Sequence, residues 1–294
     1  MSLALTRDPH KSAPRRRRRW LFNGGAAAVG VIVLFWTLLP VYNILLLAFT
    51  DDPEEFDGII WPHDFSLEGF KMIWTGEDWL LANFWHQFGN SIIIGFGTMA
   101  LTVGIGALAS FAIGRMGLRK GWTIGNVSLV IYAVPASFLV IPFARLMSVY
   151  GLSDTLFSVI ASQVIFALPY AVLILHQYGK LIPLELDESA RIDGATPLQI
   201  FFKIYLPLMA PALAAVATYS LLLAWNEYLY QFVLLSSEGS MTVAAGINKF
   251  FDADEAPWNY LMAVTVVFSL PPIAVYYILR RYMVAGLTMG GVKG

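Results

Sequence analysis

Long apolar runs separated by polar intervals set the pattern of this chain. Each run has about 20 residues or more, the length that an α-helix needs to cross the hydrocarbon core of a bilayer. The pattern predicts an all-α integral membrane protein with six transmembrane helices. Their expected ranges are about 21–49, 88–113, 122–146, 157–177, 207–235 and 259–280. Prolines interrupt some runs, which membrane helices tolerate where neighbours supply partners for the freed carbonyls; they are Pro135, Pro142, Pro207 and Pro211.

The composition fits a membrane protein and narrows the chemistry. The chain of 294 residues is 57% hydrophobic and 13% charged, whereas soluble domains carry about 25% charged residues. It has no cysteine and only four scattered histidines, so we expect neither disulfides nor a metal site. It contains no GxxxxGK[ST] phosphate loop, no nucleophile elbow and no HExxH motif. The chain is therefore not expected to be an enzyme, and any ATP that energises it must bind another subunit.

Basic residues predict how the chain sits in the membrane. A polar tail, residues 1–20, holds five consecutive arginines, and the apolar run after it is too long for a signal peptide and lacks a clear cleavage site. Sixteen of the nineteen lysines and arginines lie in the N-terminal tail, in the loops 114–121 and 178–206, and at the C-terminal end from position 280 onward. Because cytoplasmic loops are enriched in positive charge, both termini and the 178–206 loop are predicted to be cytoplasmic. The membrane domain then spans 21–281, followed by a cytoplasmic tail, 282–294.

The 178–206 loop has the pattern of a helical hairpin. Pro183 can open a short helix, Gly194 can end it in a left-handed cap, and residues 196–199 read as a capping box with proline at the first helical position. Ion pairs of Arg191 with the acids at positions 187 and 188 would support a solvated face. Leu184, Ile192 and Ala195 would form an apolar face. Such a hairpin can seat in the groove of a partner protein.

A polar and aromatic cluster interrupts the predicted fifth span. An ionisable side chain inside a span is a functional candidate, and Glu227 is the clearest case. Aromatic faces and hydrogen-bonding groups together suit a polyhydroxylated ligand. Alternatively, the polar members bond to neighbouring helices and the aromatic members belong to the interfacial belt. The candidates for the substrate pathway are Trp225, Asn226, Glu227, Tyr228, Tyr230 and Gln231, with Tyr132, Gln163 and Tyr170 as minor candidates.

The hairpin resembles the EAA motif of permease subunits of binding-protein-dependent ABC importers. That motif reads EAA, three residues, G, nine residues, I, one residue, LP. Every spacing is kept here, and serine in place of the first alanine is the one departure. The matching residues are Glu188, Ser189, Ala190, Gly194, Ile204, Leu206 and Pro207.

Further segments are similar to the carbohydrate-uptake branch, and most of all to the second permease subunit of maltose-type systems. These are residues 193–197, 224–227 and 281–294. The resemblance implies the type I importer permease fold and a location in the cytoplasmic membrane of a bacterium or archaeon. It also implies a heterodimer with a homologous permease, two ATPase subunits that carry ATP and magnesium, and a periplasmic or lipid-anchored solute-binding protein. No nucleic acid is implied.

The resemblance carries roles onto particular positions. The hairpin from about Pro183 to Lys203 would be the coupling helix, with ATPase contact at Glu188, Ser189, Ala190, Asp193 and Gly194. An external loop within 236–250 would reach the solute-binding protein through Ser236, Glu238, Gly239, Ser240, Met241 and Thr242. The terminal tail is expected to touch the ATPase dimer. In related systems much of the substrate contact comes from the partner permease, so the fifth-span cluster can simply line the pathway.

Two other functions compete with an importer subunit. An ion-coupled secondary transporter would use Glu227 as its coupling carboxylate, but it predicts internal repeats that are not visible and leaves the hairpin without a purpose. A membrane scaffold or enzyme leaves the polar cluster unexplained. The sugar stays open among monosaccharides, disaccharides, oligosaccharides, polyols and glycerol phosphate esters, and the aromatic residues favour oligosaccharides.

Overall fold

The computed structural model describes residues 13–51, 61, 64–118, 121, 123, 129–130, 134–251 and 257–289; for 13–24 and 284–289 it describes the backbone alone. The pathway candidate Tyr132 lies outside these residues, as do most of the N-terminal tail and the end of the C-terminal tail. The regular secondary structure of the described residues is helical, apart from an isolated antiparallel bridge between Thr50 and Phe65. The predicted all-α class is confirmed.

Four long apolar helices in the described residues match predicted spans: α1 (Ala13–Ala48), α3 (Phe84–Arg115), α6 (Leu156–Gly179) and α14 (Trp258–Met289). Helices α1 and α14 are longer than the expected spans. The end of the predicted N-terminal tail, 13–20, and the start of the predicted C-terminal tail, 282–289, are therefore helical. Residues 15–19 are arginines, which favour helix, and Pro14 stands in the first turn of α1, where proline is tolerated. Gly286 lies inside α14 without ending it.

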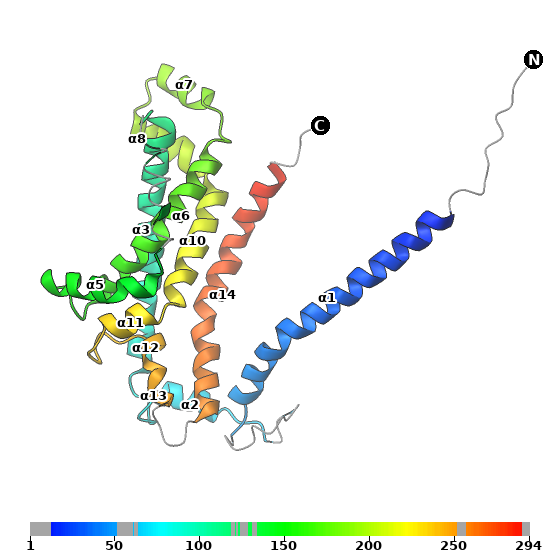
Figure 1. Ribbon diagram of the computed structural model, residues 1–294, viewed down its shortest axis with the longest axis vertical. Helices are drawn as coiled ribbons and strands as arrows, with labels where there is room; N and C mark the ends of the chain where they lie inside the picture. The colour runs from blue at the N-terminus through cyan, green and yellow to red at the C-terminus, as the bar shows by residue number, and fades with distance from the viewer. Residues whose placement is uncertain are drawn as a thin grey trace, which may run out of the picture.

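Helix α3 packs against α6 and α10 (Ala210–Trp225), which also contact each other, while α14 packs against α10 and α1. The buried face of α3 carries small and hydroxyl side chains, which let membrane helices approach closely. They are Ser91, Gly95, Thr98, Thr102, Gly106 and Ser110. Figure 1 shows α1 leaning away from this bundle and meeting it at its C-terminal end, near α2 (Glu68–Thr75).

The predicted third span is represented by a shorter helix, α5 (Ala136–Val149). Most of residues 122–133, its expected first half, lie outside the described residues. Pro135 immediately precedes α5 as its N-cap. Because proline disfavours the helical conformation in the residue before it, a helix boundary at this point is expected.

The predicted fifth span is wrong as a continuous helix over 207–235. A π-helical turn, η2 (Phe201–Tyr205), leads into α9 (Leu206–Leu208), and the axis bends by 78° before α10 begins. Pro207 and Pro211 supply no backbone donors there, which explains the break. Helix α10 then ends at Trp225, and α11 (Leu229–Leu234) follows after a three-residue break. Residues 226–228 therefore lie between two helices rather than deep inside one.

Short helices form the two ends of the molecule. At one end, α7 (Glu185–Ile192) and α8 (Pro197–Ile200) make the hairpin, and Figure 1 shows α14 running toward this same end. At the other end lie α2, α12 (Val243–Gly246) and α13 (Asn248–Phe251). This arrangement puts the loops predicted to be cytoplasmic at one end and the loops predicted to be external at the other.

Candidate functional site

The tip of the hairpin is a Schellman turn followed by a capped helix. The amide of Gly194 donates to the carbonyl of Arg191 (3.0 Å) and that of Ala195 to Ala190 (2.9 Å), the two bonds of this motif. Gly194 has a φ of +82°, a conformation that favours glycine. The Thr196 hydroxyl then accepts from the amide of Gln199, whose side chain accepts from the amide of Thr196. The predicted helix, left-handed turn and capping box are confirmed.

Most of the predicted ATPase-contact residues lie on the outward side of this hairpin. Glu188, Ser189, Asp193 and Gly194 are exposed, while Ala190 is partly buried and packs on the core beneath. Ser189, the departure from the motif, donates its hydroxyl to the Glu185 carbonyl (2.8 Å) within the helix and so leaves the hairpin surface unchanged.

Two apolar side chains extend the exposed tip. Ile192 is 86% exposed and Leu198 65% exposed, one on each side of the Gly194 turn. The sequence placed Ile192 on an apolar face with Ala195, but Ala195 is partly buried against the core. Exposed apolar side chains on a polar hairpin are typical of a surface that a partner covers.

The inward side of α7 carries a buried ion pair that the sequence did not predict. Asp187 lies 3.5 Å from the guanidinium of Arg115 at the end of α3, and their side chains are only 5% and 3% exposed. The expected pair between Asp187 and Arg191 is therefore wrong. Position 187 faces the bundle, whereas the Arg191 side chain donates to the backbone carbonyl of Arg115 (3.4 Å).

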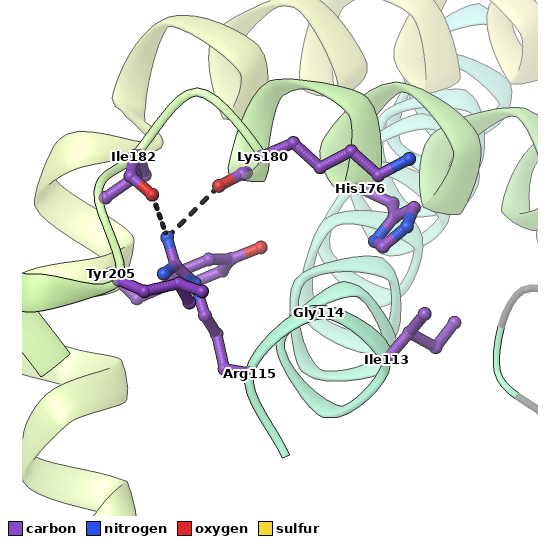
Figure 2. A pocket seen from close by; sticks show the side chains of 9 residues that line it. Ile113, Gly114, Arg115, His176, Lys180, Ile182 and Tyr205 are labelled. Atoms are coloured by element: carbon purple, nitrogen blue, oxygen red, sulfur yellow. Dashed lines mark hydrogen bonds between the residues drawn. The ribbon is translucent and has the colours of Figure 1, made fainter. Parts of the chain in front are cut away.

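The guanidinium of Arg115 holds the chain that leads from α6 into α7. Its Nη2 donates to the carbonyls of Gly179 (3.1 Å) and Ile182 (2.8 Å), and Figure 2 shows the side chain directed at this linker. The guanidinium also lies 5.8 Å from the ring of Tyr205, whose hydroxyl hydrogen-bonds to Ser110 of α3 (2.8 Å). Arg115 and Tyr205 line a cavity of about 230 Å³ between the ends of α3 and α6.

Trp225, a pathway candidate, lies in the packing between helices. It is buried against Gly95 of α3 and stacks on Phe268 of α14, with ring centroids 4.7 Å apart. Its indole Nε1 donates to the carbonyl of Phe268 (3.1 Å). That carbonyl is four residues before Pro272, which has no amide to donate. The indole therefore supplies the partner that the proline removes from α14.

Glu227 sits at the break and starts α11. Its carboxylate accepts from the amides of Tyr230 (3.0 Å) and Gln231 (3.3 Å), the free donors of a helix N-terminus. Tyr230 is 2% exposed and donates its hydroxyl to the Ala136 carbonyl of α5 (2.8 Å). Gln231 is buried as well, and donates to the Ala224 carbonyl (3.1 Å). All three side chains brace the break.

The remaining described candidates differ in exposure. Asn226 and Tyr228 lie on the surface at the break. Tyr170 of α6 is 39% exposed and packs against Tyr219 of α10, with centroids 4.5 Å apart. Tyr219 was not among the candidates, yet it lies two helical turns before Asn226 and so on the same face of α10. Gln163 is buried and donates to Ser162 (3.4 Å).

The predicted binding-protein loop is held by residues far away in the chain. Asp154 accepts from the amides of Ser236 (2.8 Å) and Ser237 (3.1 Å) and from the Ser240 hydroxyl. Bonds from Ser237 and Ser240 hold the pKa of the Asp154 carboxyl well below its usual range. Asp154 has a φ of +56°, which aspartate tolerates better than most residues.

Helix α3 braces the same loop from a second direction. His86 hydrogen-bonds to the Gly239 carbonyl (2.7 Å), and Asn90 donates to the carbonyls of Gly239 (3.1 Å) and Met241 (2.9 Å). Of the predicted contact residues, Ser236, Glu238 and Gly239 are exposed, Met241 is partly buried, and Ser240 and Thr242 are buried. The amide and imidazole at positions 90 and 86 gave no signal in sequence because their partners lie in another part of the chain.

An apolar helical bundle with a braced hairpin at one end and an anchored loop at the other is the architecture of a transport permease. Residues 102–288 match the model of the family described as "Binding-protein-dependent transport system inner membrane component". The chain belongs to this family and is a permease of an ABC importer in the cytoplasmic membrane. The resemblance first seen in the EAA motif is confirmed.

Relatives along nearly the whole chain agree. The "Arabinooligosaccharides transport system permease protein AraQ" of Halalkalibacterium halodurans is 32% identical over 279 residues, 94% of this chain and 96% of that protein. The "Trehalose transport system permease protein SugB" of Mycobacterium tuberculosis is 32% identical over 270 residues, 91% and 97% of the two chains. A permease chain of a bacterial ABC transporter that imports alginate shares the fold, with a TM-score of 0.74 at 22% identity over 94% of this chain and 99% of that chain.

Proposed function

We propose that this chain moves a sugar or oligosaccharide into the cytoplasm by alternating access. It acts with a homologous permease, two ATPase subunits that bind ATP and magnesium, and an external solute-binding protein. Both of its termini are cytoplasmic, and it catalyses no reaction itself. Relatives named for arabinooligosaccharides and trehalose support the carbohydrate class. The observation that carries the proposal is the hairpin, whose turn is fixed, whose inward side is tied to the bundle and whose tip is exposed.

The exposed tip of the hairpin is the docking surface for an ATPase subunit. Ile192 and Leu198 supply the apolar contact, and Glu188 and Asp193 supply charge at its rim. Ser189 and Gly194 allow close approach because both are small. Ala190 contributes from beneath, by seating the helix on the core. When the ATPases bind ATP and close, they displace this rigid element and the bundle opens outward.

The loop anchored by Asp154 receives the solute-binding protein. Ser236, Glu238 and Gly239 form the contact surface, and Met241 lies at its edge. Ser240 and Thr242 are buried and hold the loop in shape, Thr242 through a hydrogen bond to Gln231. This last contact joins the loop to the helix break, so docking at the loop reaches the fifth-span cluster directly.

The exposed face of α6 and α10 lines the substrate pathway. Tyr170, Tyr219, Asn226 and Tyr228 offer aromatic faces and hydrogen-bonding groups of the kind that sugars use. Other side chains shape this face from behind, because they are buried or partly buried and are bound to neighbouring backbone or side chains. They are Trp225, Glu227, Tyr230, Gln231 and Gln163.

Reconstitution tests the proposal. The purified chain, its permease partner and the ATPases are reconstituted in vesicles together with the solute-binding protein. Uptake is measured with a panel of radiolabelled arabino-, gluco- and chito-oligosaccharides. We expect uptake of at least one sugar that requires ATP and the binding protein and survives collapse of the proton gradient. Uptake that persists without ATP and stops when the proton gradient is collapsed would instead favour an ion-coupled transporter.

A further inference from the structure

The coupling hairpin is continuous in the chain with α6 on one side and with η2, α9 and α10 on the other. Helix α3 is not adjacent to it in the chain. Yet α3 is the helix that packs against both α6 and α10, so a displacement that includes α3 moves the bundle as one unit. A displacement that leaves α3 behind must instead shear its two largest interfaces.

Phe111 of α3 packs its ring against Phe201, with ring centroids 5.2 Å apart, and Arg115 adds a charged contact from α3 to the hairpin. Two carbonyl oxygens of the α6–α7 linker, at Gly179 and Ile182, fix its Nη2. The other nitrogen, Nη1, faces the Asp187 carboxylate at 3.5 Å. A planar guanidinium can serve these partners together, which the single ammonium of lysine cannot do.

Asp187 depends on Arg115 more than the reverse. Both carboxylate oxygens of Asp187 are buried and accept no hydrogen bond from the described residues. Arg115 is therefore the group that balances this buried charge, and a buried carboxylate without its partner is strongly unfavourable. Separating α7 from the end of α3 is correspondingly resisted, which makes the pair a stiff link rather than a surface contact.

We infer that Arg115 and Asp187 are positioning residues for energy coupling: they tie the coupling helix to α3, so that movement of the hairpin is delivered to α3 together with α6 and α10. This role rests on the proposed docking of an ATPase at the hairpin. Neither residue touches ATP or sugar. Their loss should therefore leave docking and hydrolysis in place and lower the amount of sugar moved for each ATP hydrolysed.

The test measures that ratio in the reconstituted transporter. Asp187→Asn removes the charge with little change in shape, and we expect the ratio of sugar uptake to ATP hydrolysis to fall roughly fivefold or more, the usual lower range of coupling between two sites. ATPase co-purification should be unchanged. Glu185→Gln is the matched control, since this carboxylate lies on the same helix but is exposed; its ratio should equal that of the wild type. An Asp187→Asn transporter with the wild-type ratio would overturn the inference.

A second variant separates folding from coupling. If Asp187→Asn fails to assemble, Arg115→Met with Asp187→Leu removes both charges and fills the space with apolar groups, a replacement that buried ion pairs often tolerate. Assembly should recover while the ratio stays low, whereas a ratio restored to the wild-type value would show that the link is mere packing. Wild-type uptake that needs no ATP would refute the proposed function and this role together, and that outcome is visible before any variant is compared.

Discussion

Replacing Gly194 with alanine isolates the backbone of the hairpin turn. A Cβ at this position meets no atom within 4 Å, so alanine introduces no collision in the chain itself. Its penalty comes from the φ of +82°, which disfavours any residue with a Cβ by about 1–2 kcal/mol. The turn can escape this strain only by opening, which breaks the bond from Ala195 to Ala190 and releases α8 from α7.

The strain converts into a loss of ATPase binding. If docking requires the closed turn, 1–2 kcal/mol of strain weakens the affinity of the permease pair for the ATPase by about 5–30-fold. Titration of labelled ATPase against permease pairs in nanodiscs measures this affinity. Gly30→Ala is the control, because its Cβ also meets no atom but its position in α1 has no positive φ; it should bind ATPase like the wild type.

Replacing Gly194 with asparagine tests whether Gly194→Ala weakens ATPase binding through backbone strain or through the size of the new side chain. Asparagine is larger than alanine but tolerates the left-handed conformation. If the conformation of the turn governs docking, Gly194→Asn should bind more tightly than Gly194→Ala. If the ATPase instead presses directly on this position, the larger asparagine should bind more weakly than alanine, and the reasoning from φ would be refuted.

Three further substitutions test the packing of the molecule. Trp225→Phe keeps an aromatic ring but removes the indole N–H that donates to the Phe268 carbonyl, so thermal unfolding should show a loss of about 1–3 kcal/mol. The sugar affinity of the folded transporter should be unchanged; altered sugar affinity at full stability would place Trp225 in the pathway. Asp154→Asn should lower the melting temperature at pH 7. Because the pKa of Asp154 is lowered in the folded state, the higher stability of the wild type should diminish as the pH falls below about 4. A stability difference that does not depend on pH would show that the charge of Asp154 is not what stabilises the loop. Thr196→Ala removes the capping box and should weaken α8 by about 1 kcal/mol, seen as faster amide hydrogen exchange at Gln199.

The features that the sequence predicts well are local. The hairpin turn depends on residues within a few positions of each other. A glycine after a helix predicts a left-handed C-terminal cap, and a capping box predicts the start of the next helix. Apolar runs likewise predict α3 and α6 to within a few residues. The bend before α10 was harder to see, since Pro207 and Pro211 are compatible with either a kinked helix or a broken one.

Contacts between distant segments carried no such signal. Asp187 has Arg191 one turn away on its own helix, and local spacing favours that pair. The structure chooses Arg115 instead, because α7 lies with position 187 against the end of α3. Asp154 similarly gives no sign in sequence of holding Ser236 and Ser240. The sequence predicts on which side of the membrane a group of charged loop residues lies. It does not predict their individual partners, because these depend on which loops lie together in the folded chain.

The fifth-span cluster shows why polar residues in a span do not identify a pathway by themselves. Every backbone carbonyl inside a bilayer needs a hydrogen-bond donor. In this chain, Pro272 leaves the carbonyl of Phe268 without a backbone donor, and the end of α10 leaves further carbonyls without one. Trp225 donates a hydrogen bond to the carbonyl of Phe268, and Gln231 donates one to the carbonyl of Ala224 at the end of α10. Side chains that make these hydrogen bonds are held in place, so they are not free to bind a sugar as it moves through the pathway. The pathway is therefore better sought among polar and aromatic side chains that do not hydrogen-bond to the backbone of a neighbouring helix. Among the described residues, the tilted ring pair of Tyr170 and Tyr219 meets that condition.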